Sequence, residues 1–372
     1  MDSTSLLEGK KTRLSQALKA RCFTKNIPLQ ASLELTHRCN LRCCHCYIPF
    51  NRVSREEMSL AEICGVLKQL KEAGTLFLAL TGGEIFLRED LLDIIRSAQQ
   101  EGFIISRLLT NGTLITGAIA KDLNKANIKK IELSIYGATQ NTHDTVTQVP
   151  GSFEATLRAI RVLQDEGLQI ILKMIILNLN ASEVQGVQEL ARELGAGFSG
   201  DYILSPRLDG AKEPLRYCIT IPQRDRYLAG WWLHQGIEPF DPGHIIRDIQ
   251  KGLAQDFDPS NFGICGAGRI MCNISPEGWV SPCLILPIKG GNLRETTLLE
   301  AWHSREMESF RSLNMAERQQ CQCCDLIRWC SKCPGIALLE GGNLLGCSAQ
   351  IRELALWRRA EFINLKLTHE VT

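Results

Sequence analysis

Between about residue 31 and residue 210, short apolar runs alternate with longer amphipathic segments, and this alternation limits the possible folds more than any other feature of the sequence. Each short run is rich in leucine or β-branched residues, as strands are, and each longer segment repeats apolar residues at intervals of three and four, as helices do. A strand followed by a helix, repeated six times, predicts a parallel sheet with right-handed crossovers. A partial (β/α)6 barrel of the α/β class is the economical closure.

The predicted elements divide this part of the chain evenly. Strands are predicted at Ser32–Leu35, Leu76–Leu80, Ile104–Leu109, Lys130–Ile135, Gln169–Leu177 and Gly200–Leu204. Helices are predicted at Ser59–Ala73, Arg88–Glu101, Ile115–Ala126, Ser152–Glu166 and Ala181–Leu194, with Ser59 and Ser182 as candidate caps. Reactive groups in such barrels gather where the strands end. Residues that directly follow strands are therefore the first candidates for a site.

Polar motifs follow the first four predicted strands, so all of them should lie on one rim of the barrel. The motifs are Cys39–Cys46, Thr81–Glu84, Thr110–Thr113 and Ser134–Gly137. Gly82 and Gly83 lack side chains and would let backbone groups approach a ligand closely. Taken alone, a Gly-Gly-Glu sequence fits an ordinary strand-to-helix turn, but its place one unit after a cysteine loop favours a binding site.

Cys39, Cys43 and Cys46 are the cysteines that say most about chemistry. Three thiolates within eight residues can hold three corners of a four-iron cluster and leave the fourth iron open to bind a substrate directly. The alternative is a zinc knuckle, but zinc sites usually use four closed ligands built from two close pairs. Cys44 is a spare thiol in this loop.

The Cys-x3-Cys-x2-Cys loop after an apolar strand resembles the signature of the radical S-adenosylmethionine (SAM) enzymes. The resemblance implies the partial barrel, and an open iron that chelates the methionine part of SAM. One electron would then cleave the sulfonium to give a 5′-deoxyadenosyl radical. The implied cofactor-binding residues are Gly82, Gly83 and Glu84 near the methionine amino group, Ser134 near the ribose or carboxylate, His45 beside the adenine, and Asn111 on the same rim.

The second cysteine region contains Cys265 and Cys272, then Gly278 and Cys283, then Cys321, Cys324, Cys330 and Cys333, and finally Cys347. This pattern resembles the SPASM domain, a small cysteine-rich α+β unit that follows the barrel in many radical enzymes. Eight thiolates equal two four-cysteine sets, with zinc again the alternative. The resemblance implies Cys265, Cys272, Cys283 and Cys333 for the first auxiliary cluster, and Cys321, Cys324, Cys330 and Cys347 for the second. The last short spacing is two residues where the family usually has three, a departure that touches Cys333.

Two questions stay open in this region. The segment 273–283 indicates a β-hairpin with a Pro-Glu-Gly turn, which would hold cysteines on adjacent strands. If Cys272 is not a ligand, the first auxiliary cluster has an open iron for a substrate; with Cys272 it is closed and better suited to moving electrons. Cys323 could replace Cys321 or Cys324. Buried packing is the default for the cysteines without a role, which are Cys22, Cys44, Cys64, Cys218 and Cys323.

Composition sets the surroundings in which these motifs work. A net charge of +1 over 372 residues gives no argument for nucleic acid, and no stretch reaches transmembrane length. The first thirty residues lack the apolar core of a signal peptide, so we expect a cytoplasmic protein with reduced thiols. The expected division is 1–30 N-terminal extension, 31–210 barrel, 211–260 helical linker, 261–350 SPASM auxiliary-cluster domain and 351–372 C-terminal helix.

The resemblance implies three [4Fe–4S] clusters, one that binds SAM and two auxiliary, and an external electron donor such as ferredoxin or flavodoxin. Two extra clusters suit a net oxidation, because the product radical must lose an electron. The expected substrate is a ribosomally made peptide that is crosslinked or oxidised at a side chain, with any peptide-recognition protein acting in trans. A sulfatase maturase is disfavoured, because Leu284 stands where those enzymes are understood to carry an aspartate base.

Two other classes of function remain. One is a radical enzyme that acts on a small molecule or a tetrapyrrole, like the haem-pathway relatives that alter propionate side chains. The other is a non-catalytic metal-binding or electron-carrying module. For the substrate side, Asp201, Arg207 and Asp209 follow the sixth strand, and Lys173 lies on the fifth, but a solvated surface is the more ordinary reading of each. His143 and Asp144 are expected in a loop that caps the next helix.

Overall fold

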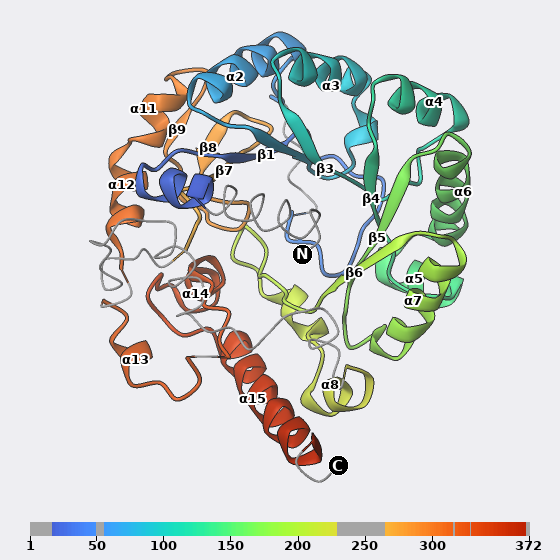
Figure 1. The fold of residues 1–372 in the computed structure, drawn as a ribbon, viewed down its shortest axis with the longest axis vertical. Helices are drawn as coiled ribbons and strands as arrows, with labels where there is room; N and C mark the ends of the chain where they lie inside the picture. Colours follow the sequence, from blue (N-terminus) through green and yellow to red (C-terminus); the bar gives the residue numbers. More distant parts are fainter. Residues whose placement is uncertain (1–16, 50–55, 229–264, 315–316, 328, 370–372) are drawn as a thin grey trace, which may run out of the picture.

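The computed structural model describes residues 17–49, 56–228, 265–314, 317–327 and 329–369. Its strands form a nine-stranded sheet in the order β6-β5-β4-β3-β2-β1-β7-β8-β9. The first six strands run parallel, which confirms the predicted barrel (Figure 1). They are β1 (Gln30–Glu34), β2 (Phe77–Thr81), β3 (Ile104–Thr110), β4 (Lys130–Ser134), β5 (Gln169–Ile175) and β6 (Gly197–Asp201).

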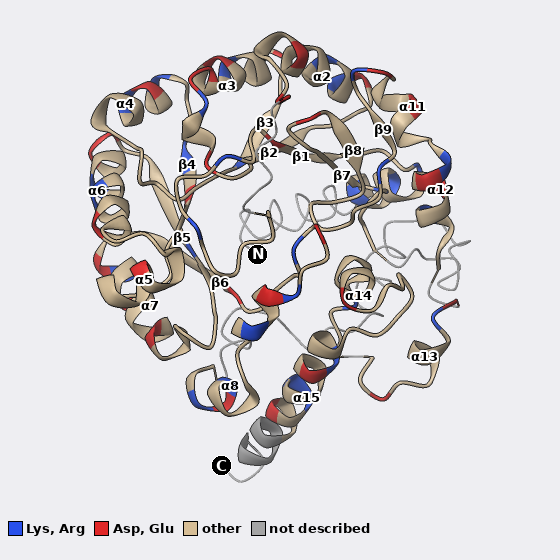
Figure 2. Cartoon of the chain, turned by 180° about the vertical axis from the view of Figure 1, so that it is seen from behind, with Lys and Arg blue, Asp and Glu red and all other residues tan. Residues whose placement is uncertain are grey.

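Helices surround the convex side of this sheet. They are α2 (Leu60–Glu72), α3 (Leu91–Gln100), α4 (Gly117–Lys125), α5 (Gln140–Thr147), α6 (Ser152–Asp165) and α7 (Val184–Glu193). Figure 1 shows α2, α3, α4 and α6 following one another around the outside, so the concave side of the sheet faces inward. Lysine, arginine, aspartate and glutamate alternate along these helices, with both signs on the same elements (Figure 2).

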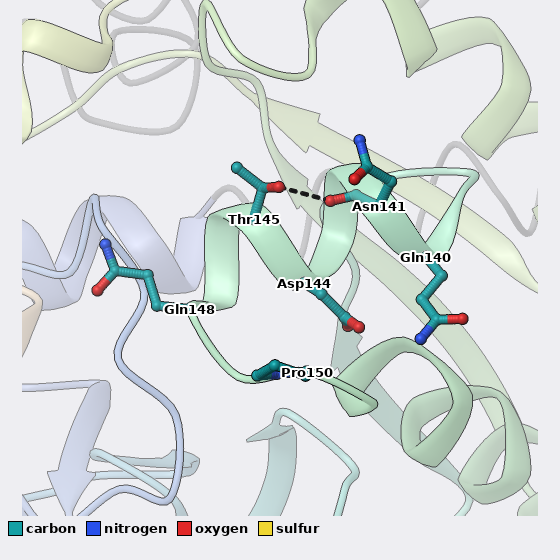
Figure 3. A pocket seen from close by; sticks show the side chains of 6 residues that line it. All are labelled: Gln140, Asn141, Asp144, Thr145, Gln148 and Pro150. Carbon is teal, nitrogen blue, oxygen red and sulfur yellow. Dashed lines mark hydrogen bonds between the residues drawn. The ribbon is translucent and has the colours of Figure 1, made fainter.

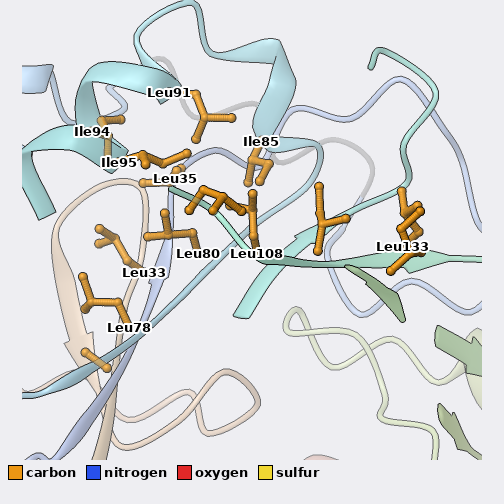
Figure 4. Close-up of a cluster of buried hydrophobic side chains, with 14 of the residues drawn as sticks. Leu33, Leu35, Leu78, Leu80, Ile85, Leu91, Ile94, Ile95, Leu108 and Leu133 are labelled. Carbon is orange, nitrogen blue, oxygen red and sulfur yellow. The ribbon is translucent and has the colours of Figure 1, made fainter. Parts of the chain in front are cut away.

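The core lies between the sheet and these helices. Leu33, Leu78 and Leu80 have no measurable exposure and pack against residues of α3 such as Ile94 (Figure 4). Burying a leucine of this kind contributes about 1.5–3 kcal/mol. Because strand side chains alternate between faces, the intervening residues, among them Glu34, point to the concave side. Apolar packing thus leaves one face of every strand available for polar chemistry.

The C-terminal region continues the same sheet. Strand β7 (Met271–Ile274) pairs in parallel with β1, opposite Ala31 at Cys272. Strands β8 (Trp279–Ser281) and β9 (Gly291–Asn292) follow in antiparallel order. The predicted hairpin over 273–283 is confirmed, and Gly278 turns it with a φ of 89°. The auxiliary region therefore extends the barrel sheet directly.

The remaining helices follow β6 in the chain. They are α8 (Ile221–Tyr227), α11 (Leu298–Trp302), α12 (Arg305–Ser312), α13 (Gln319–Gln322), α14 (Pro334–Gly341) and α15 (Ala349–His369). Helix α11 packs beside α2 on the outside of the sheet (Figure 1). Figure 1 shows α15 extending away from the barrel at the C-terminal end. Within the described residues, no helix is both long enough and apolar enough to cross a membrane.

The structure departs from the predicted elements in three places. Strand β6 begins at Gly197, three residues before its predicted start, because Gly197 and Phe198 continue the ladder with β5. His143 and Asp144 lie inside helix α5 rather than in a loop. The N-cap of α2 is Ser59 with a full capping box, as predicted, but Ser182 lies in the 3-10 turn Ala181–Glu183 and does not cap α7. Residues 229–260 of the predicted linker lie outside the described residues.

One buried arginine ties the carboxyl end of β1 to the turn before α2. The Arg88 guanidinium donates to the carbonyls of Leu35 at 3.1 Å and Met58 at 2.9 Å, and it pairs with Asp90 at 2.7 Å. Only 7 % of its side chain is exposed. Because Leu35 opens the cysteine loop, Arg88 fixes the start of the site.

We expect Arg88→Met to lower the free energy of unfolding by about 1–3 kcal/mol, since two buried carbonyls lose their donor. The matched control is Arg96→Met, whose side chain is 52 % exposed and pairs with Asp93 at the surface; it should change stability by less than about 0.5 kcal/mol. Anaerobic urea unfolding of the cluster-loaded protein measures both. Equal midpoints for the two variants would contradict the role given to Arg88.

Candidate functional site

The loops that follow β1 and β2 are fastened to each other by backbone hydrogen bonds. Gly83 N donates to Thr36 O at 2.7 Å, and Glu84 N donates to Arg38 O at 2.8 Å. The motif after β2 therefore lies against the chain that leads into Cys39. The predicted meeting of these two motifs on one rim is what the structure shows.

The two glycines are required by this contact. A Cβ atom on Gly82 would lie 2.3 Å from Thr36 O, and Gly82 also has a φ of 145°. A Cβ on Gly83 would lie 2.2 Å from Arg38 O. Real Cβ atoms do not approach backbone so closely. The sequence predicted glycine here for the approach of a ligand, but the constraint that the structure displays is the approach of the cysteine loop itself.

Glu84 is buried without measurable exposure, and its carboxylate is occupied by protein donors. It accepts from Thr110 Oγ1 at 2.6 Å, from Asn111 N at 2.8 Å and from Phe86 N at 3.1 Å. Burial raises the pKa of this carboxyl, and the three donors oppose that shift. The side chain thus joins the ends of β2 and β3, and the backbone of the motif is what remains to contact a cofactor.

Asn111 positions the first cysteine. Its Nδ2 donates to Asn40 Oδ1 at 2.9 Å and contacts Cys39 Sγ at 3.9 Å, while its Oδ1 accepts from Thr113 N at 2.9 Å. Asn40 in turn donates to Thr113 Oγ1 at 2.7 Å. The loop after β3 thereby holds the cysteine loop in place from the side opposite to the glycines.

The three thiols of the first loop lie near one another. Burial raises the pKa of Cys43 well above its ordinary value, and the charges of Cys46 and Cys39 raise it further. Burial likewise raises the pKa of Cys46 to about 11. Buried thiols that disfavour one another as thiolates fit a site that holds a positively charged metal group, because metal binding requires the thiolate. Cys39, Cys43 and Cys46 could therefore hold a metal cluster.

Tyr136 connects the predicted adenine and ribose positions. Its ring packs edge-on against His45 with centroids 4.8 Å apart, and its hydroxyl hydrogen-bonds Cys43 and Ser134. Its backbone N donates to His143 Nδ1 at 3.2 Å. Among the described residues, the buried Nδ1 of His45 has no hydrogen-bond partner. His45 and Ser134 thus lie on the same side of the cysteine loop.

Helix α5, which the sequence did not predict, supports the cysteine loop. The carbonyls of Val146 and Thr147 each accept a backbone hydrogen bond from the loop, from Cys44 and Arg42 respectively, at 3.0 Å. Polar residues such as Gln140 and Asn141 weaken the apolar period of this helix, which is why it escaped notice. The signal that could have found it is Thr139, which caps the helix at Thr142.

Asp144 caps the following helix. It accepts from Gly151 N at 2.7 Å and from Phe153 N at 2.9 Å. A depression of about 640 Å³ beside it is lined by Gln140, Asn141, Asp144, Thr145, Gln148 and Pro150 (Figure 3). A second, of about 350 Å³, lies at the amino ends of β4, β5 and β6, around Lys130 and Gln169. Neither contains a residue of the cysteine rim.

Charged side chains line the concave face of β3, β4 and β5. Arg107 and Glu132 form a bidentate pair with distances of 2.8–3.1 Å. Lys173 donates to Ser199 Oγ at 2.8 Å and lies level with Ser134 in the sheet register. Burial lowers the pKa of Lys173, although Glu132 and Asp201 oppose that shift. Among the described residues, no carboxylate forms an ion pair with Lys173.

The polar residues after β6 divide into two kinds. Asp201 and Asp209 accept local backbone hydrogen bonds, from Ile203 and Ala211, and so stabilise turns. Arg207 lies close enough to Cys46 to lower its pKa, and it also faces Glu213 at 3.8 Å. Arg207 is therefore the residue of this loop that the structure brings to the cysteine rim.

A buried ionic group next to the rim was missed by the sequence analysis. His37 lies 3.6 Å from Glu34 on β1 and 3.4 Å from Glu277 in the β7–β8 turn. Although burial lowers it, Glu277 and Glu34 raise the pKa of His37 to about 9. Glu34 also accepts from Asn273 Nδ2 at 2.9 Å and from Tyr47 at 3.1 Å. The sequence feature that could have indicated this group is Glu34, a charged residue between two leucines in a predicted strand.

The cysteines of the second region fall into two sets, with two cysteines outside them. The charges of Cys265 and Cys333 raise the pKa of Cys283, so these three lie together. Cys330, Cys321 and Cys324 likewise affect Cys347. The structure does not bring Cys272 to either set, because its side chain is 1 % exposed within the barrel core. Cys323 is exposed.

Comparison with known proteins agrees with this geometry. The family model described as "Radical SAM superfamily" matches residues 33–191, and the model described as "Iron-sulfur cluster-binding domain", SPASM, matches residues 265–334. The chain is 30 % identical over 346 residues to the "AdoMet-dependent heme synthase" of Methanosarcina barkeri strain Fusaro, which covers 86 % of this chain and 95 % of that one.

The chain is also similar to a second curated protein and to a solved structure. The "Antilisterial bacteriocin subtilosin biosynthesis protein AlbA" of Bacillus subtilis strain 168 is 28 % identical over 328 residues, which are 87 % of this chain and 69 % of that one. The crystal structure of Streptococcus suis SuiB bound to its precursor peptide SuiA has a TM-score of 0.66 at 16 % identity, and covers 95 % of this chain and 82 % of that one. The likeness to SuiB shows the same fold.

We expect Gly83→Ala to lose about four irons per chain after anaerobic reconstitution, since the new Cβ would displace the loop that carries Cys39. The control is Gly117→Ala at the start of α4, where a Cβ meets nothing within 4 Å; it should keep the wild-type iron and sulfide content. Full iron loading of Gly83→Ala would show that the glycine contact does not organise the cluster loop.

Proposed function

Because this chain belongs to the radical SAM superfamily and carries a SPASM domain, we propose that it is an oxidative radical enzyme that acts on a carboxylate-bearing substrate of the haem-synthesis type. In this family SAM and its [4Fe–4S] cluster supply a 5′-deoxyadenosyl radical that takes a hydrogen atom from the substrate, and the SPASM domain binds auxiliary iron–sulfur clusters. The observation that carries the proposal is the match to a haem synthase along nearly the whole of both chains.

The residues of this chain position the cofactor from three sides. Gly82 and Gly83 hold the cysteine loop by backbone contact, Asn111 holds Cys39 from the side of β3, and Tyr136 holds Cys43 from the side of β4. The cofactor-binding roles assigned to Glu84, Ser134 and His45 are part of this proposal. A site supported on three strand ends keeps reacting atoms aligned, which is where rate enhancement of this kind originates.

Lys173 supplies a place for a substrate carboxylate. It lies on the concave face, level with Ser134, and it donates a hydrogen bond to the neutral hydroxyl of Ser199. A half-buried ammonium without a carboxylate partner among the described residues would gain most from an anionic ligand. A propionate side chain docked on Lys173 would bring its neighbouring carbon atoms toward the SAM side of the rim.

The chemistry balances as an oxidation. A propionate that loses one hydrogen atom, one electron and carbon dioxide leaves a carbon–carbon double bond. The hydrogen atom goes to the deoxyadenosyl radical, and the electron must leave through a redox partner. The SPASM domain brings auxiliary clusters beside the barrel, and an external donor such as ferredoxin or flavodoxin would supply the initiating electron.

Peptide modification is the second candidate. It is favoured by the similarity to the subtilosin biosynthesis protein over 87 % of this chain. The substrate would then be a ribosomally made peptide, crosslinked or oxidised, with a peptide-recognition protein acting in trans. The same cation at Lys173 would bind an acidic residue or the carboxyl terminus of that peptide.

The two candidates give different products from one assay. We expect the reconstituted enzyme, with SAM and dithionite, to form 5′-deoxyadenosine and to convert an iron porphyrin with propionate side chains into a product lighter by one carbon dioxide and two hydrogens. Mass spectrometry follows both compounds. Deoxyadenosine without any porphyrin product, together with a modified peptide encoded beside this gene, would favour the second candidate. Protein that carries its full complement of iron–sulfur clusters but never cleaves SAM would contradict both candidate functions.

Lys173→Met should raise the KM for the carboxylate-bearing substrate about 10–100-fold, the cost of one charge-assisted hydrogen bond. Uncoupled cleavage of SAM should be unchanged, and Lys173→Arg should recover part of the affinity. Lys130→Met is the control, because Lys130 is exposed at the opposite end of the sheet. A uniform loss of SAM cleavage in Lys173→Met would instead indicate a structural role.

A further inference from the structure

We propose that Trp279 on β8, together with Lys289 in the loop after it, forms a stacking platform for the conjugated ring of the substrate. The position of the platform and its preference for an anionic aromatic ligand are inferred from this chain's own side chains. Only the type of ring rests on the proposed function. The platform would hold one end of a substrate whose carboxylate at the other end is docked on Lys173.

The register of three strands places Trp279 at the rim that carries the cysteine loop. Ile274 of β7 lies opposite Leu33 of β1, and Val280 of β8 lies opposite Ile274. Trp279 is therefore level with Glu34 at the carboxyl end of β1. Two strand spacings separate the backbones of these two residues, a distance of about 10 Å.

Glu34 in turn contacts the cysteine loop itself. Its carboxylate accepts a hydrogen bond from the Tyr47 hydroxyl at 3.1 Å, and Tyr47 directly follows Cys46 in the chain. Trp279 is thus two strands away from a side chain that touches the loop where the predicted radical chemistry begins. A substrate that lies on Trp279 would be close to that loop.

Trp279 lies on the concave face of the sheet, as Glu34 does. Val280, the next residue, is buried in the core between the sheet and the helices. Because strand side chains alternate between faces, Trp279 and Ser281 point the other way. Asn273 agrees with this assignment, since its Nδ2 lies 2.9 Å from Glu34 Oε2 and 3.4 Å from Ser281 Oγ. Trp279 therefore faces the side of the sheet on which the polar groups lie.

Trp279 differs from tryptophans that serve the core. Trp302 is 1 % exposed and donates from its indole nitrogen to Asn26 O at 2.7 Å. Trp357 is 3 % exposed and donates to Asp225 at 2.8 Å. Trp279 is partly exposed, and among the described residues its indole N–H has no hydrogen-bond partner. An accessible aromatic ring with an unused donor is what a ligand site provides.

Lys289 gives the platform its preference for anions. Its ammonium lies 4.4 Å from the centroid of the Trp279 ring, a cation–π contact that holds the charge beside the indole. Lys289 is exposed, and no carboxylate of the described residues pairs with it. An anionic ring that stacks on the exposed part of the indole would bring a carboxylate next to this ammonium.

The platform and Lys173 lie far apart on the same face. Five strands separate β8 from β5, which carries Lys173 (Figure 1). A substrate with a broad planar ring and carboxylates along its edge can contact both places at once, whereas a small acid with one carboxylate contacts only one. The arrangement therefore selects for a large, flat, multiply charged substrate.

Binding can be measured without turnover. The probe is a metal-free porphyrin with four propionate side chains, whose own fluorescence reports binding to the cluster-loaded enzyme with SAM and without reductant. We expect Trp279→Leu to raise the Kd about 3–10-fold, because a stacked aromatic pair is lost. Trp279→Phe keeps an aromatic ring and should recover most of the affinity.

The charge is tested in the same assay. Lys289→Met should raise the Kd about 2–5-fold, the range of an exposed ion pair. The control is Lys68→Met, because Lys68 is exposed on α2 outside the sheet; it should leave the Kd unchanged. An identical Kd in Lys289→Met and Lys68→Met would remove Lys289 from the platform.

A structural role for Trp279 predicts a different pattern. On our proposal, Trp279→Leu keeps the wild-type iron content, urea midpoint and uncoupled cleavage of SAM, and only the affinity for the porphyrin falls. Equal Kd values in the wild type and Trp279→Leu would overturn the platform. Equal losses in Trp279→Leu and Trp279→Phe would also overturn it, because stacking requires that an aromatic replacement restore binding.

The platform and the proposed function fail in different ways. If the porphyrin binds to the wild type and more weakly to Trp279→Leu, but its iron complex is never decarboxylated under dithionite, the proposed function is wrong and the platform stands. Decarboxylation with the same KM in the wild type and Trp279→Leu would refute the platform and keep the function. No binding of the porphyrin to the wild type would overturn both.

Discussion

The close contact between two stretches of backbone organises this molecule. Gly82 and Gly83 lie against the carbonyls of Thr36 and Arg38 with no room for a Cβ atom. That contact brings the end of β2 to the loop that carries Cys39, and Glu84 then joins it to the end of β3 through Thr110 and Asn111. The helices outside the sheet only need to be apolar on one face. The rim, by contrast, depends on the direct contact of two backbone segments, so we expect the addition of a single methyl group there to have a large effect.

The sequence predicted much of this, and for physical reasons. A buried parallel strand must be apolar and must end in a turn, so the period of the chain located β1 to β5 and placed the motifs after them. The predicted start of β6 was three residues too late because Gly197 and Ser199 are not apolar. In the structure, backbone pairing with β5 extends the strand to Gly197. It missed α5 because that helix supports the cysteine loop through its carbonyls, and backbone groups leave no trace in composition. It also missed the group around His37, whose partners lie some 240 residues apart in the chain and meet only because β7 pairs with β1.

The cysteines show the same limit. The spacing of the cysteines predicted a three-cysteine loop and a later set of eight, but it does not say which way each side chain points. In a strand, direction alternates with every residue, so the position of Cys272 relative to its neighbour Asn273 decides whether its sulfur meets a cluster or the core. The surroundings of Cys272 thus depend on the register of β7 with β1, which is known only once the partner strand is known.

The pairing of β7 with β1 also has a consequence for biosynthesis. One edge of β1 is occupied by β2, which follows soon in the chain, while the other stays bare until residue 271 has emerged from the ribosome. An unpaired strand edge of this kind is a template for association with other chains. The pairing of β7 therefore also covers the second edge of β1, and this edge is exposed during the interval between the synthesis of β2 and that of β7.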